Sequence, residues 1–208
     1  MHRFVIITAM SMSAIPASAA PDDKLTFYGV AMMEPIAIPE CGTFTDPAKF
    51  RKKYGTYPYA PPTSGPCYRR DDRSKSGTAE PMTYENIDIQ FPVATAPGVG
   101  FGFSALVLDG KIQALRWMTR GQPQQAAMFA QLRGKLGEPT STTADALQNG
   151  FGAKYESLRA TWSLPQTVTA VFQGIDGRID QGKVEIMSEA ARARVMEELS
   201  KANKSTPL

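Results

Sequence analysis

Alternating apolar and polar residues and apolar runs predict β-structure from residue 86 onward in this 208-residue chain. Residues 86–91 alternate in this way, which predicts a strand with one buried face. Apolar runs at 101–108 and 112–119 flank Asp109-Gly110. An Asp-Gly pair between two such runs is a strong indication of a β-hairpin. Three further strands are predicted from later apolar runs, at 158–164, 168–172 and 183–187.

Helical spacing marks one segment between these strands and one after them. Residues 123–136 begin with Pro123 and end before Gly137, as helices commonly do. Ser188 is a suitable N-cap for a second helix over 189–202. The segment 141–152 is mostly polar and rich in Thr, Asn and Gly, which favours a loop.

The order of these elements predicts an α+β fold. We expect an antiparallel sheet of about five to six strands, with the central and C-terminal helices packed on one face. The other face should be partly exposed to water, because short hairpins join most of the strands. Residues 98–208 would form this core, and residues 20–97 would belong to the same domain.

Proline usage separates residues 20–97 from the core. Ten of the 16 prolines lie between Pro35 and Pro97, so this region should be dominated by loops. It also contains Cys41 and Cys67, the only cysteines of the chain. In an exported protein two cysteines favour a disulfide, and we expect a Cys41–Cys67 bond to hold this region against an edge of the sheet.

The first 19 residues have the features of a cleavable signal peptide. Arg3 supplies a positive charge, residues 4–15 are apolar, and Ala17-Ser18-Ala19 matches a cleavage site. The apolar stretch is shorter than the ~20 residues of a membrane span. We therefore expect a periplasmic or secreted protein without a transmembrane anchor. The alternative is that these residues form a buried N-terminal strand or helix.

Charge argues against a nucleic-acid partner. Loss of Arg3 with the signal peptide would leave 22 Lys and Arg against 20 Asp and Glu, a net charge of +2. The two signs are mixed along the chain, whereas nucleic-acid-binding proteins usually concentrate basic residues on one face.

The position of the only histidine limits the chemistry of the mature chain. His2 lies inside the predicted signal peptide, so the mature protein has no histidine. This excludes Ser-His-Asp and Cys-His catalysis and histidine-ligated metal sites. Glycine-rich residues 98–102 do not have the spacing of a dinucleotide-binding loop. We expect neither a cofactor nor a metal.

One stretch resembles small exported bacterial α+β domains, most of them uncharacterised. The resemblance rests on Gly110-Lys111-Ile112, on the helix end at 132–139 and on Trp162. It covers about 80 residues and implies the fold and the compartment, without an activity.

Aromatic and basic residues gather around the predicted disulfide loop. Rigid Tyr side chains on a constrained loop provide contact area at low entropic cost, and Tyr and Arg are enriched in binding hot spots. The candidate binding residues are Tyr54, Tyr57, Tyr59, Tyr68, Arg69 and Arg70. The alternative is that these tyrosines cover the edge of the sheet.

These observations predict an exported, non-enzymatic binding or accessory protein of the cell envelope. An inhibitor-like module that binds an envelope or secreted protein fits the Tyr-rich loop. Two alternatives stay open. One is a carboxylate-dependent hydrolase of envelope polysaccharide, because two suitably spaced carboxylates suffice for that reaction. The other is a small-molecule or lipid carrier with a pocket between sheet and helices. No residue pattern specifies an oligomeric state.

Overall fold

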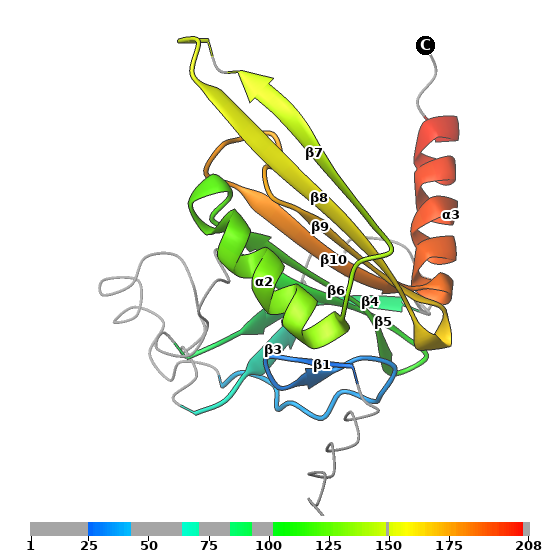
Figure 1. Ribbon diagram of the computed structural model, residues 1–208. Coiled ribbons are helices and arrows are strands. Elements are labelled where there is room, and N and C mark those ends of the chain that lie inside the picture. Colours follow the sequence, from blue (N-terminus) through cyan, green and yellow to red (C-terminus); the bar gives the residue numbers. More distant parts are fainter. Residues whose placement is uncertain (1–24, 43–63, 71–83, 93–101, 149, 206–208) are drawn as a thin grey trace, which may run out of the picture.

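The structure, a computed structural model, describes residues 25–42, 64–70, 84–92, 102–148 and 150–205. Within these residues it is an α+β fold with an eight-stranded antiparallel sheet (Figure 1). In spatial order the strands are β3 (Cys67–Arg70), β4 (Tyr84–Gln90), β5 (Phe103–Leu108), β6 (Lys111–Thr119), β10 (Gly182–Ser188), β9 (Val168–Gln173), β8 (Lys154–Leu164) and β7 (Ser141–Gln148). The remaining elements are the hairpin β1 (Thr26–Phe27) and β2 (Val30–Ala31), the helices α2 (Gln125–Leu136) and α3 (Glu189–Ser205), and the 3₁₀ turns η2 (Gln122–Gln124) and η3 (Pro165–Thr167).

The sheet is larger than the five to six strands expected from the sequence, because two segments predicted as loop are strands. Residues 141–148 form β7, which pairs with β8 in continuous register. All eight of its side chains are exposed, so the strand lacks the alternation that would have predicted it. Residues 67–70 form β3, which pairs with β4 at the opposite edge.

Local sequence rules correctly predicted the turns and helix ends. Asp109 and Gly110 both have positive φ, of 49° and 74°, and join β5 to β6. Gly137 ends α2 with a φ of 81°. At the start of α3 the hydroxyl of Ser188 accepts a hydrogen bond of 3.1 Å from the amide of Ala191. Among the described residues no helix is long and apolar enough to cross a membrane.

The main hydrophobic core covers one face of the sheet, which we call the closed face. Trp117, Trp162 and Phe172 lie at its centre and are almost completely buried. Helix α2 covers them with Met128 and Leu132, and the β1–β2 hairpin covers the neighbouring strands. Helix α2 connects the central strand β6 to the edge strand β7, so it crosses this face over the intervening strands.

Helix α3 packs on the opposite face, which we call the open face, so the prediction that both helices share one face is wrong. Ala191 of α3 contacts Leu106 of β5 and Ala114 of β6 in a separate small cluster. These strand residues alternate with those of the closed face, and neighbouring residues of a strand point to opposite faces. Helical periodicity shows which side of a helix is apolar, and it carries no information about which face of the sheet that side contacts.

The Cys41–Cys67 disulfide is confirmed, with an S–S distance of 2.03 Å and a Cα–Cα distance of 5.0 Å. Beside it, the amide of Cys41 donates to the carbonyl of Tyr68, and the amide of Tyr68 donates to the carbonyl of Pro39. Residues 39–41 therefore lie along the outer side of β3 and cover this edge of the sheet.

Candidate ligand-binding groove

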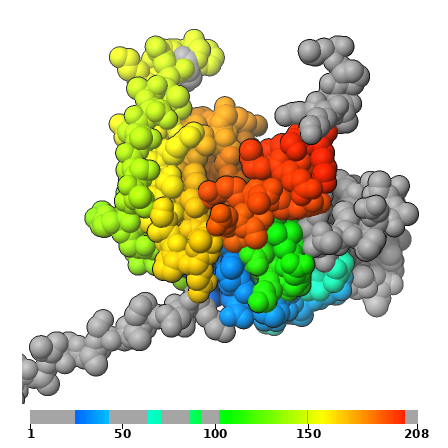
Figure 2. All heavy atoms as spheres, turned by 90° about the vertical axis from the view of Figure 1, so that its right-hand side faces the viewer, coloured from blue at the N-terminus to red at the C-terminus, as the bar shows by residue number. Residues whose placement is uncertain are grey.

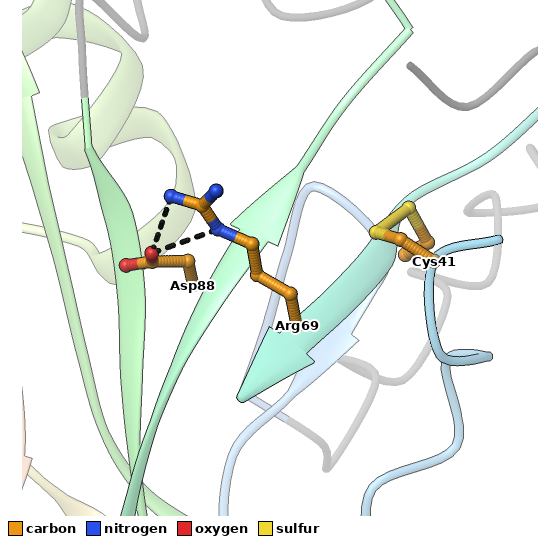
Figure 3. The surroundings of a disulfide bond; sticks show 4 residues. Cys41, Arg69 and Asp88 are labelled. Atoms are coloured by element: carbon orange, nitrogen blue, oxygen red, sulfur yellow. Dashed lines mark hydrogen bonds and ion pairs between the residues drawn. A yellow bond between two sulfur atoms is a disulfide. The ribbon is translucent and has the colours of Figure 1, made fainter. Parts of the chain in front are cut away.

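Three of the six candidate binding residues lie on β3, where all three have contacts within the fold. The ring of Tyr68 is half-buried against the main core. The guanidinium of Arg69 donates two hydrogen bonds, of 2.8 and 3.0 Å, to one carboxylate oxygen of Asp88 on β4 (Figure 3). Arg70 lies over the Tyr68 ring, 5.7 Å from its centroid.

The other three candidates, Tyr54, Tyr57 and Tyr59, lie outside the described residues. The structure therefore shows no surface that combines the six residues, and the binding role of this group stays a prediction. Tyr68 and Arg69 have packing and ion-pair contacts that explain their positions without a partner.

A groove of about 430 Å³ lies between α3 and the open face. Figure 2 shows α3, in red, across this face. The helix is anchored at its first turn, where Ser188 caps it and Ala191 is fully buried. Further along the helix Leu199 is 54% exposed, because the sheet no longer covers that turn. The groove follows from this arrangement: one end of α3 is packed on the sheet and the other leaves a space beside it.

Apolar side chains line the groove on both the sheet side and the helix side. Three of them come from the strands, and two come from the helix face above. They are Leu106, Ala114, Met187, Val195 and Leu199. Such a surface favours an apolar ligand group, because each apolar Å² removed from water contributes roughly 25 cal/mol.

Polar side chains also line the groove, and one of them is Arg116. Arg116 on β6 lies between Ser104 of β5 and Glu185 of β10 in the strand register. Its Nε and Nη2 atoms contact Oε1 of Glu185 at 2.8 and 2.5 Å. Among the described residues Nη1 of Arg116 has no hydrogen-bond partner, and the side chain is 51% exposed. One donor of this cation therefore remains for a ligand.

A second set of charged side chains forms ion pairs along α3. Arg194 forms ion pairs of 2.7 Å with both Glu197 and Glu198. Lys201 lies 2.8 Å from Glu197. The hydrogen bonds from Lys201 and Arg194 lower the pKa of Glu197, and the hydrogen bond from Glu197 raises the pKa of Lys201. These pairs order the long side chains of α3, of which Arg194 and Glu198 line the groove.

A smaller cavity of about 220 Å³ lies between α2 and the β1–β2 hairpin. It borders the ring of Trp117, whose buried Nε1 has no hydrogen-bond partner among the described residues. Known ligand pockets have volumes of about 300–1,000 Å³. The groove beside α3 falls within this range and the smaller cavity does not, so the groove is the better candidate for a ligand site.

One feature of the sequence indicates that the open face is covered. The run of residues 103–108 is apolar at nearly every position, whereas a strand with one wet face alternates. Leu106 belongs to the open face, and its apolar side chain indicates that something covers it. The cover is α3, which is far away in sequence, so only the fold brings the two together.

No cluster of three or more His, Cys, Asp or Glu side chains that could hold a metal ion occurs in the part of the chain that the structure describes. The chemistry of the groove is thus that of an apolar lining beside an arginine. Comparisons of the chain with models of protein families, with curated proteins and with solved structures give no match.

Proposed function

We propose that this protein is an exported, non-enzymatic binding protein of the cell envelope that carries a small amphipathic anion in the groove beside α3. The observation that carries this proposal is the combination of an apolar lining with the open donor of Arg116. The location rests on the predicted signal peptide, and the Cys41–Cys67 disulfide is consistent with an oxidising compartment.

The ligand should have an apolar body and one anionic group. A volume of about 430 Å³ accommodates a small molecule of moderate size. Arg116 favours a carboxylate, sulfonate or phosphate, since charge-assisted hydrogen bonds are about twice as strong as neutral ones. Glu185 and Glu198 lie beside the same groove, and their carboxylates disfavour a ligand with several negative charges.

Binding is favoured over catalysis by the residues that the chain offers. The chain has no histidine beyond residue 2, and its two cysteines form the disulfide, which leaves neither a histidine base nor a thiol nucleophile. Of the carboxylates beside the groove, Glu185 is paired with Arg116 and Glu198 with Arg194. These pairs orient the arginines, which suits recognition of an anion.

A pair of fluorescent probes tests the proposal. 1-Anilinonaphthalene-8-sulfonate carries a sulfonate, and N-phenyl-1-naphthylamine has the same rings without it. We expect both to bind the folded protein. Leu199→Glu should weaken the binding of both probes about tenfold or more. It removes apolar contact area of the groove, and the expected loss of binding free energy is ~1.4 kcal/mol or more. Met196→Glu is the matched control: it makes the same change on the same helix at a residue that is 61% exposed and does not line the groove.

The role of Arg116 is tested with the same two probes. Arg116→Gln should weaken the sulfonate probe about tenfold and leave the neutral probe unchanged. Arg192→Gln, at an exposed position of α3 outside the groove, should change neither. Equal weakening by Leu199→Glu and Met196→Glu, or no binding of either probe to the wild-type protein, would contradict the proposal.

A further inference from the structure

Strand β7 is an edge strand with an open outer side. It pairs with β8 through all of its eight residues, and it is the last strand of the sheet. On its other side no strand of the described chain pairs with it. Figures 1 and 2 show that the turn end of the β7–β8 hairpin projects beyond the neighbouring strands.

The composition of β7 does not protect this edge. Natural edge strands are usually shortened, covered, bulged or supplied with Lys or Pro, because open edges pair with other chains. The opposite edge follows this rule: β3 has four residues, carries two arginines and is covered by residues 39–41. In contrast, β7 has eight residues in unbroken register, with neither Lys nor Pro, and Asp145 is its only charged residue.

We infer that β7 pairs antiparallel with β7 of a second copy of this chain, about a two-fold axis perpendicular to the sheet. This inference does not depend on the proposed ligand. A two-fold axis turns a strand into its own antiparallel partner, which continues the antiparallel order of the sheet into the second copy. In such a dimer the backbone groups at the open edges of both copies form hydrogen bonds with each other. An added peptide would pair with the edge of one copy only.

The register of this pairing follows from the faces of the strand. Residues directly opposite each other must point to the same face, so the axis passes midway between one residue of β7 and its own copy. An axis at Ala144 places Ala144 opposite its own copy and Thr143 opposite Asp145 of the second copy, where the hydroxyl can donate to the carboxylate. An axis at Asp145 would place two carboxylates opposite each other, which is unfavourable. An axis at Thr143 would pair fewer residues of the strand. Ala144 is therefore the predicted centre.

The strength of the dimer is expected to be moderate. One strand pair is smaller than the ~1,600 Å² of a standard protein interface. We expect a dissociation constant in the micromolar range, visible as a rise in molar mass with concentration by light scattering or sedimentation equilibrium. Ala144→Lys places two like charges across the axis and should weaken the dimer about tenfold or more. Ala126→Lys, at an exposed alanine of α2, is the matched control and should leave the dimer unchanged.

Single cysteines test the register. Both native cysteines are bonded to each other, so an introduced thiol is the only free one. Under mild oxidation Ala144→Cys should form a covalent dimer on a non-reducing gel. Ala146→Cys, which would face Thr142 of the second copy, should do so much more slowly. A wild-type protein that remains monomeric across the concentration series would overturn the inference, and so would a dimer that Ala144→Lys does not weaken. Equal rates for the two cysteine variants would overturn the register.

Discussion

The two faces of the sheet are built from the same strands and differ in how they are covered. On the closed face, Trp117, Trp162 and Phe172 are enclosed by α2 and the β1–β2 hairpin. On the open face, the buried cluster consists of Leu106, Ala114 and Ala191. The large, fully buried side chains of the closed face contribute most to the free energy of unfolding. On the open face α3 contacts the sheet through a few small side chains, and a groove remains beside the helix. The closed face contains most of the buried core, and the open face leaves the space in which we propose that a ligand binds.

The largest expected effect is on the closed face. Phe172 is 0% exposed and packs near Phe129 of α2, with ring centroids 6.4 Å apart. Phe172→Ala removes this packing and leaves a cavity, so the free energy of unfolding should fall by about 3–5 kcal/mol. Urea denaturation measures this change directly. Probe binding in the groove should persist in whatever fraction remains folded, because the variant does not touch the open face.

The matched change on the open face is Leu106→Ala. Leu106 is 8% exposed and borders the groove, so the space left by its truncation joins a space that solvent already reaches. The expected loss is about 2 kcal/mol, at the low end for buried leucines. Affinity for the neutral probe should fall, because part of the apolar lining is removed. A loss of stability as large as that of Phe172→Ala would contradict the division between the faces.

The closed face was more accessible to sequence analysis than the open face. Alternation predicted β4, apolar runs predicted β5, β6, β8, β9 and β10, and Asp109-Gly110 predicted the turn between β5 and β6. These signals are local, and they depend on one face being buried. Strand β7 has both faces exposed, so its sequence shows no period, and pairing with β8 alone makes it a strand.

The location of the candidate groove could not be predicted from local sequence patterns. Its lining comes from β4, β5, β6, β10 and α3. Arg116 faces it only because β6 pairs with β10, which places Glu185 beside the guanidinium. The candidate tyrosines were predicted instead because they lie close together along the chain. An arginine between two distant strands has no such neighbours in sequence.

The attachment of α3 provides an intermediate effect. Ser188→Ala removes the hydroxyl that accepts from the amide of Ala191, and loss of an N-cap costs about 1 kcal/mol. Because this cap lies where α3 meets the sheet, probe affinity should fall together with stability. Ser200→Ala is the control on the same helix. Its hydroxyl donates to the carbonyl of Glu197 at the exposed surface, and its loss should change stability by less than about 0.5 kcal/mol. If the two variants behave alike, the first turn does not anchor the helix.

The smallest expected effect concerns the ion pairs that Glu197 forms within α3. The pKa of Glu197 is lowered by hydrogen bonds from Lys201 and Arg194, so its stabilising contribution is present above the unfolded value near ~4.3. That contribution is lost as the pH falls through the lower folded value. The pKa of Lys201 is raised by Glu197, so its contribution is present below ~10.4 and is lost as the pH rises through the folded value.

The difference in unfolding free energy between the wild-type protein and Glu197→Gln should therefore be largest near neutral pH and shrink at both extremes. It should be small, because these side chains are exposed, and high salt should reduce it further. Glu156→Gln removes a carboxylate of β8 that has no ion pair among the described residues, and its difference should not follow this profile. A Glu197→Gln difference that grows toward acid would reverse the assigned sign. It would mean that these ion pairs do not stabilise α3.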